Sequence, residues 1–92
     1  MIKAEDLEIP PYLARTLLRL ASWGETNEDL GRALGTTYRT TIQYVRLLME
    51  MTDTPTRAAL VAWAWREGFM RAVPASYLGE KTAGTVLMVG TA

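Results

Sequence analysis

The chain has 92 residues, of which 49% are apolar, and its ten basic and ten acidic side chains give a formal net charge of zero. It contains no cysteine and no histidine, which excludes disulfides, thiolate nucleophiles, the commonest zinc ligands and a histidine general base. We therefore expect one small domain that is not an enzyme and has no metal site, cofactor or small-molecule substrate. The balanced charge also counts against nucleic-acid binding, although a local basic patch is enough for it.

The N-terminal segment MIKAEDLEIPP is acidic and lacks the apolar core of a signal peptide. The longest apolar run, AALVAWAW at residues 58–65, is far too short to span a bilayer. The sequence therefore predicts a cytoplasmic protein without a membrane-spanning segment.

Two amphipathic helices are expected in the first part of the chain. The first begins at the proline pair 10–11, where a missing N–H costs nothing, and carries leucines at three- and four-residue spacings up to Gly24. The second is short, because Thr26 with Asp29 three residues later is a capping-box variant and Gly35 already ends the helix.

Two further helices are expected after this point. The turn GTT leads into the third helix, for which Thr37 is the expected N-cap. After the pattern breaks at TDTPT, Thr54 followed by a proline predicts a new cap and first helical position. The fourth helix is then expected from Thr56 to Glu67, with Gly68 as its terminating glycine. The inward positions expected on the third helix are Thr41, Val45, Leu48 and Met49, with Tyr38 or Leu47 at the edge.

These boundaries predict an N-terminal arm at residues 1–9, a helical domain at residues 10–70 and a C-terminal tail at residues 71–92. The tail is broken by proline and glycines, and only TVLMV, residues 85–89, has the composition of a strand. The expected fold class is therefore all-α, with four helices and a partly irregular tail.

The fourth helix carries an apolar block that leaves it without a polar face. A helix that is apolar all round must be covered on more than one side, and a four-helix domain of this size covers one side only. Two explanations stay open: the C-terminal tail folds over the helix, or the helix is the seam of a homodimer. The residues expected at such a dimer interface are Leu60, Trp63, Ala64 and Trp65.

A helix, a short helix, a turn through Gly35 and a longer helix form a helix-turn-helix pattern. Residues 27–70 resemble the DNA-binding domain of the LuxR-type (GerE-like) transcription regulators, and with the preceding helix the resemblance covers residues 10–70. A fragment similar to region four of sigma factors, which is built on a related motif, would give much the same pattern. The matching residues are Leu34-Gly35, Thr37, Thr40-Thr41-Ile42, Arg57 and Gly68-Phe69-Met70.

The resemblance implies that the third helix lies in the major groove of duplex DNA. Its base-facing residues would then be Ile42, Gln43 and Arg46. Glutamine can pair bidentately with adenine and arginine with guanine, while Ile42 could touch a thymine methyl group. The resemblance also makes the fourth helix the dimer contact, which agrees with its apolar block.

Phosphate contacts are implied at the ends of the same motif. Thr37 and Thr40 would cap the third helix and contact phosphate, with Arg39 and Arg57 as further phosphate contacts. Tyr44 stands where the family often has a histidine; it is expected at the edge of the core, with a phosphate contact as the alternative.

The sequence departs from the family pattern where the family carries charge. Ile42 stands where a lysine is common, and Glu50 and Met51 stand at the end of the recognition helix, which is often basic. Each lost phosphate contact weakens binding and its salt dependence. The resemblance therefore carries the fold more safely than the activity.

The leading hypothesis is a small cytoplasmic transcription regulator, of bacterial or phage origin, that binds duplex DNA as a homodimer. The chain is too short for an attached receiver or ligand-binding domain, so expression level, a partner or dimerisation would regulate it. The alternative is a protein-interaction module that keeps the fold, no longer binds DNA, and modulates a regulator or the transcription machinery. The zero net charge, Ile42, Glu50 and the tryptophan-rich fourth helix favour this alternative.

Overall fold

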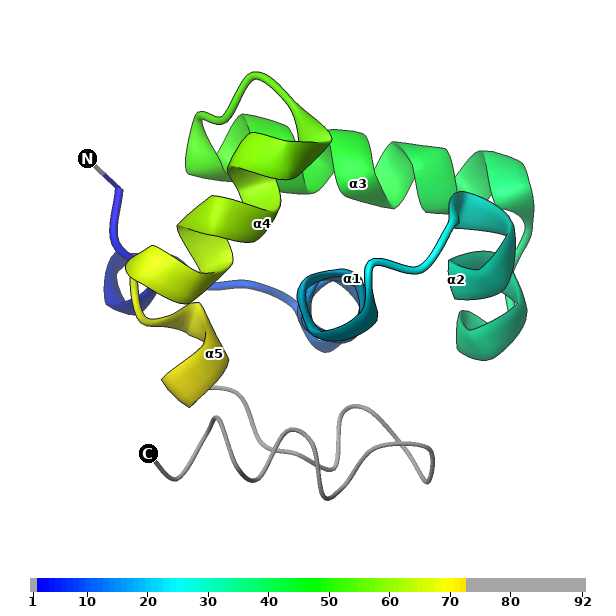
Figure 1. Cartoon of the computed structure of the whole chain (residues 1–92), viewed down its shortest axis with the longest axis horizontal. Coiled ribbons are helices and arrows are strands. Elements are labelled where there is room, and N and C mark those ends of the chain that lie inside the picture. The colour runs from blue at the N-terminus through cyan, green and yellow to red at the C-terminus, as the bar shows by residue number, and fades with distance from the viewer. Residues whose placement is uncertain (1, 73–92) are drawn as a thin grey trace.

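The computed structural model describes residues 2–72, and all of the regular structure in this range is helical (Figure 1). The expected all-α fold with its four main helices is confirmed, and a short fifth helix follows Gly68. No helix in this range is long and apolar enough to cross a membrane. Most of the expected tail, including the strand-like segment 85–89, lies outside the described residues. The elements are η1 (Ala4–Asp6), α1 (Pro11–Trp23), α2 (Asn27–Leu34), α3 (Tyr38–Thr52), α4 (Arg57–Arg66) and α5 (Phe69–Ala72).

Threonine hydroxyls cap three of the helices. The Oγ1 atom of Thr26 accepts the Asp29 N–H at 3.1 Å, and that of Thr37 accepts the Thr40 N–H at 3.1 Å. At α4 the cap is Thr56, whose hydroxyl lies 3.0 Å from the Ala59 nitrogen. Each hydroxyl satisfies an N–H group that has no partner within its helix, which is why these helices begin where they do.

The predicted cap at Thr54 is wrong, because this residue closes the preceding helix. Its N–H donates to the Met49 carbonyl at 3.0 Å, and its hydroxyl lies 2.9 Å from that of Thr52. Between them Asp53 adopts the left-handed conformation, with φ of 54°. Residues 52–54 therefore form the C-terminal cap of α3, and α4 begins two residues later than Thr54 would have placed it.

Helix α1 forms the centre of the domain. Figure 1 shows it end-on, with α3 across one side and α2 and α4 on its flanks, and it contacts all three. Its apolar side chains on several faces are almost fully buried, because a central helix is covered on more than one side. The most deeply buried leucines of α1 are Leu13, Leu17, Leu18 and Leu20, each at most 2% exposed.

The inward face of α3 matches most of the prediction. Thr41, Val45 and Leu48 are buried, and Met49 packs half-buried against the core. The predicted edge residue is wrong, since Tyr38 is 54% exposed and Leu47 is 41% exposed. The expected core-edge position of Tyr44 is confirmed, because its ring is half-buried and lies 5.0 Å from the ring of Tyr12 on α1.

Helices α2 and α3 approach closely at Gly31. A Cβ atom added there would lie 2.9 Å from the Thr41 hydroxyl and 3.2 Å from the carbonyl oxygens of Thr36 and Thr37. The Thr41 hydroxyl is itself held by a 2.9 Å hydrogen bond to the Thr37 carbonyl. The small size of glycine therefore sets the distance between the two helices.

The expected dimer residues Leu60, Trp63 and Ala64 are at most 1% exposed within a single chain, so they belong to its core. The Trp63 indole N–H donates to the Ile2 carbonyl at 2.7 Å, and its ring packs against Phe69 at 6.4 Å. Helix α4 is thus covered by α1 and α3 on one side and by the N-terminal segment and α5 on another. Of the four residues expected at the dimer interface, Trp65 is the one that lies at the surface, with 44% of its area exposed.

Substitution of Gly31 by alanine is expected to lower the free energy of unfolding by about 1–2 kcal/mol, because the added methyl group overpacks the α2–α3 contact. This loss opposes the better helix propensity of alanine, which is about 1 kcal/mol. Urea denaturation followed by circular dichroism measures the change. The control is Ala33→Gly at an exposed position of α2, which changes helix propensity alone. A Gly31→Ala protein that is more stable than the wild type by the full propensity gain of about 1 kcal/mol would contradict the close approach.

The two tryptophans of α4 should differ in their contribution to stability. Trp63→Ala is expected to cost about 3–5 kcal/mol, as for other large aromatic side chains in a core. Trp65→Ala should cost roughly 1–2 kcal/mol, from partial burial of the ring and the loss of its indole hydrogen bond to the Ala21 carbonyl. Urea denaturation of both variants tests this, and equal losses would contradict the burial of Trp63.

Candidate nucleic-acid interface

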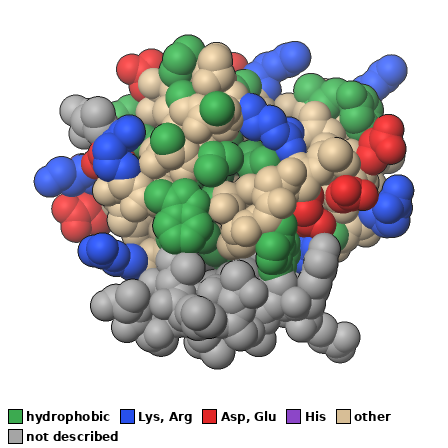
Figure 2. Space-filling view, viewed as in Figure 1, with side chains coloured by type: hydrophobic (Ala, Val, Ile, Leu, Met, Phe, Trp, Pro, Cys, Tyr) green, Lys and Arg blue, Asp and Glu red, His purple; other side chains and the backbone are tan. Residues whose placement is uncertain are grey.

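The outward face of α3 presents polar side chains to solvent. Arg39, Gln43, Arg46 and Glu50 are all exposed, and their spacing of four, three and four residues places them in one stripe along the helix. Helix α3 forms one side of the molecule, with α2 near its beginning and α4 near its end (Figure 1). Figure 2 shows Lys and Arg side chains projecting at this side of the molecule.

Aliphatic side chains flank this stripe. Ile42 is half-buried on one side, and Leu47 is 41% exposed on the other. The stripe thus combines two guanidinium groups, one amide and one carboxylate between apolar edges, which is a surface able to read base edges but poor in charge.

The beginning of α3 is held by two threonines. Thr37 is exposed and Thr40 is half-buried. Besides capping the helix, the Thr37 hydroxyl donates to the Thr40 hydroxyl at 3.0 Å. The predicted capping role of Thr37 is confirmed. Both hydroxyls lie at the N-terminal end of α3, where exposed N–H groups and the helix dipole favour an anion.

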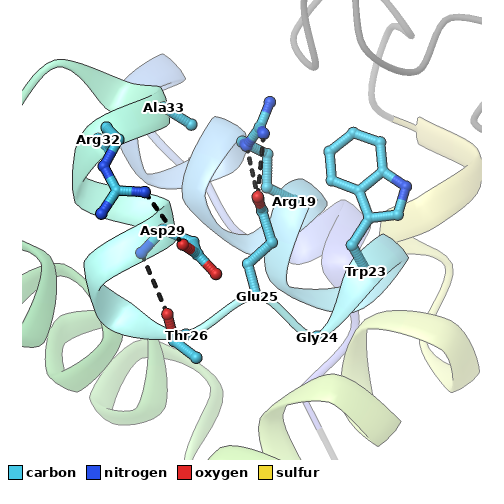
Figure 3. Close-up of a pocket in the computed structure, with 8 residues that line it drawn as sticks. All are labelled: Arg19, Trp23, Gly24, Glu25, Thr26, Asp29, Arg32 and Ala33. Carbon is cyan, nitrogen blue, oxygen red and sulfur yellow. Dashed lines mark hydrogen bonds and ion pairs between the residues drawn. The ribbon is translucent and has the colours of Figure 1, made fainter.

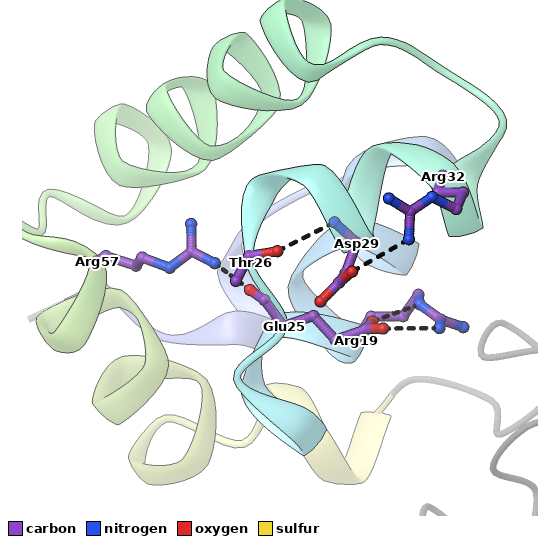
Figure 4. Close-up of polar contacts among 6 residues, drawn as sticks. All are labelled: Arg19, Glu25, Thr26, Asp29, Arg32 and Arg57. Atoms are coloured by element: carbon purple, nitrogen blue, oxygen red, sulfur yellow. Dashed lines mark hydrogen bonds and ion pairs between the residues drawn. The ribbon is translucent and has the colours of Figure 1, made fainter.

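Arg57 is used inside the protein. It is the first residue of α4 and is half-buried. Its guanidinium donates from one nitrogen to the Asn27 side-chain oxygen. Another nitrogen donates to the Glu25 carbonyl (Figure 4). Burial lowers the pKa of Arg57 from its ordinary value, although an arginine remains charged at neutral pH. The arginine expected to contact phosphate therefore ties α4 to the α1–α2 link and to the first residue of α2.

The same link carries a second, buried ion pair. The Glu25 carboxylate accepts from the Arg19 guanidinium at 2.8 and 3.2 Å, and both side chains are 8% exposed. The guanidinium also lies 4.7 Å from the ring of Trp23. These residues line a shallow hollow of about 580 Å³, into which Asp29 and its ion-pair partner Arg32 also face (Figure 3).

Neither Arg57–Asn27 nor Arg19–Glu25 was found by sequence reasoning. The first joins residues 30 positions apart, a separation at which spacing rules say nothing. The second had one signal in the sequence, because Arg19 interrupts the leucine-rich face of α1, and a charged side chain in such a place needs a partner.

Acidic groups border the candidate interface. Glu28 is exposed in the first turn of α2, and Glu50 is exposed near the end of α3. A hollow of about 500 Å³ between the beginnings of α2, α3 and α4 is lined by Glu28, Asn27, Tyr38 and Arg57. On the outward face of α3, the positive charge is thus carried by Arg39 and Arg46.

Comparison with known proteins identifies the fold. No family model matches the chain, and no curated protein matches it. A solved structure of the VqmA dimer of Vibrio cholerae in the absence of target DNA, described with the LuxR-type receptors, matches with a TM-score of 0.72 and 20% sequence identity. The match covers 88% of this chain and 37% of that one. The chain therefore has a helical fold that also occurs in a LuxR-type receptor, and it spans little more than a third of that receptor's chain.

Proposed function

We propose that this protein is a helix-turn-helix transcription regulator that binds duplex DNA with α3 and acts as a homodimer. The observation that carries the proposal is the exposed face of α3. Within residues 2–72, Arg39, Gln43 and Arg46 make no hydrogen bond or ion pair with other side chains, so their donors are available to a ligand. The fold shared with a LuxR-type receptor supports the same function.

The side chains of this face have distinct roles in the proposed complex. Arg46 and Gln43, close to the middle of α3, read base edges, arginine preferring guanine and glutamine adenine. Arg39, one turn nearer the N-terminus, contacts phosphate together with the hydroxyls of Thr37 and Thr40. Ile42 lies beside them and supplies an apolar contact to a thymine methyl group.

The charge of this surface sets how DNA is bound. Arg39 and Arg46 are opposed by Glu28 and Glu50, so each protomer releases few counterions. With Arg39 as the phosphate-binding cation of each protomer, the logarithm of the binding constant should fall with the logarithm of salt at a slope of about −1 per protomer. Non-specific binding is then weak, and specific binding depends on two half-sites occupied together.

The homodimer is proposed to form on the exposed side of α4. Ala58, Val61, Ala62 and Trp65 follow a three- and four-residue spacing, and all four are exposed or half-buried. Figure 2 shows hydrophobic side chains gathered over this part of the molecule. The two alanines allow a second helix to approach closely, and Trp65 is held by a 3.1 Å hydrogen bond from its indole to the Ala21 carbonyl. This stripe replaces the buried residues Leu60, Trp63 and Ala64 of the sequence prediction.

A second function is supported by one observation, the exposure of Leu47 beside the polar face of α3. An exposed leucine flanked by Glu50 suits a protein partner better than a phosphate backbone. On this alternative the protein has lost DNA binding, and α3 or α4 contacts a regulator or the transcription machinery.

Arg46→Ala should lower the affinity for a specific duplex by about tenfold or more, since a bidentate base contact contributes about 1–3 kcal/mol. Gln43→Ala should relax the preference at one base pair. The measurement is fluorescence anisotropy at two salt concentrations, with duplexes enriched from a random library. The control is Arg71→Ala, an exposed arginine on α5, far from α3 in Figure 1. Wild-type affinity in both α3 variants would refute the recognition face, and no enrichment by the wild type would favour the second function.

Ala62→Glu should dissociate the dimer, because it places a charge in the centre of the proposed α4 interface. Trp65→Ala should weaken dimerisation by roughly 30-fold, the effect of losing a central aromatic contact of about 2 kcal/mol. Sedimentation equilibrium over a range of protein concentrations measures both. Ala33→Glu, the same change at an exposed alanine of α2, is the control. A monomeric wild type, or an unchanged dimer in Ala62→Glu, would exclude this interface.

A further inference from the structure

We propose that Arg57 is a positioning residue, which fixes the α2–α3 unit relative to α4 and thereby sets the spacing of the two recognition helices in the dimer. The inference rests on the proposed function, because it requires that α3 reads DNA and that α4 joins the protomers. It differs from the sequence prediction, in which Arg57 contacts phosphate.

The geometry of the Arg57 contacts suits a positioning role. Arg57 is the first residue of α4, and its two acceptors lie in the link between α1 and α2 and at the beginning of α2. Figure 4 shows Arg57 reaching the backbone of this link. One acceptor is the backbone carbonyl of Glu25, and the other is the side chain of Asn27, the first residue of α2. A planar guanidinium can hold both at once, which a lysine ammonium on a flexible stem does much less well.

The α1–α2 link that Arg57 holds is itself fixed by other contacts. The Glu25 side chain is buried in its ion pair with Arg19 of α1, so the link is fixed from both sides. Gly31 brings α2 into close contact with the turn at Thr36 and Thr37, immediately before α3. Holding the beginning of α2 therefore also holds the beginning of α3.

The proposed dimer stripe on α4 begins next to Arg57. It begins at Ala58, directly after Arg57, and ends at Trp65, whose indole is bonded to the last turn of α1. Helix α4 is thus tied to the body of the domain near both ends of the stripe. Without the Arg57 contacts the N-terminal end of α4 loses its connection to α2, and two protomers joined through α4 no longer present their α3 helices at one fixed spacing.

This role predicts a difference between one and two half-sites. A phosphate contact contributes whenever a single protomer binds, so its loss weakens binding to one half-site as well as to two. A positioning contact matters when both recognition helices must fit half-sites one helical turn apart, since the gain from simultaneous binding depends on geometry.

The experiment compares a duplex carrying two half-sites with a duplex of the same length in which one half-site is scrambled. The expected result for Arg57→Lys is a loss of about tenfold on the two-half-site duplex and less than about twofold on the other. Asn27→Ala removes one of the two contacts and should give a smaller loss of the same kind, with no further loss when it is combined with Arg57→Lys. Arg39→Ala is the contrasting variant, which should weaken binding to both duplexes and reduce the salt slope.

Two results would overturn the inference alone. One is a wild type that prefers two half-sites together with an Arg57→Lys protein that keeps the same ratio. The other is an equal loss on both duplexes in Arg57→Ala that Arg57→Lys restores, which would assign Arg57 to phosphate. A wild type that binds no DNA, or binds both duplexes equally, would refute the proposed dimeric function, and the inference would fall with it. Thermal unfolding checks that the variants fold. If Arg57→Lys does not fold, the comparison of the two duplexes is made with Asn27→Ala instead.

Discussion

The close approach of α2 and α3 at Gly31 is the contact on which the candidate interface depends. A Cβ atom at this position would crowd the carbonyl oxygens of Thr36 and Thr37, so glycine lets α2 pack closely onto the turn that begins α3. This packing turns the Thr41 side of α3 inward and leaves Arg39 and Arg46 on the opposite side, facing solvent. The outward face of α3 is therefore a consequence of backbone packing as much as of its own side chains.

Local chemistry explains which parts of the fold were predictable. Thr26 and Thr37 cap helices through N–H groups three residues away, and such contacts can be read from neighbouring positions. The prediction that Thr54 caps the next helix is wrong for a related reason. A threonine before a proline can also close the preceding helix, and the Thr54 N–H does so by donating to the Met49 carbonyl. The inward face of α3 follows from its period, and Tyr44 lies at its edge as expected, against Tyr12 of another helix. Tyr38 and Leu47 are more exposed than the period indicates.

Contacts between distant residues were not predictable. A helix that is apolar on all sides must be covered by other segments, but its own sequence does not show which segments these are. Trp63 is covered by the backbone of Ile2, 61 residues away, so a residue expected in a dimer seam belongs to the core. Arg57 is a second example. The family resemblance implied that it contacts phosphate, and its guanidinium instead donates to Asn27, 30 residues away in the same chain. For the candidate site, the sequence could indicate which residues face outward on α3 and could not indicate which cations were already engaged.

Because the outward face of α3 carries little charge, the proposed DNA binding would depend on the rigidity of the domain. A strongly basic protomer can tolerate a loose dimer, because non-directional attraction to phosphate supplies much of its affinity. Here Arg39 and Arg46 stand against Glu28 and Glu50, so in the proposed complex one protomer gains little from the backbone of DNA. On this proposal, most of the useful affinity comes from two protomers binding together, and that gain is lost when geometry forbids simultaneous contact. The proposed function thus requires both a firmly tied dimer helix and the weakly charged face that would read DNA.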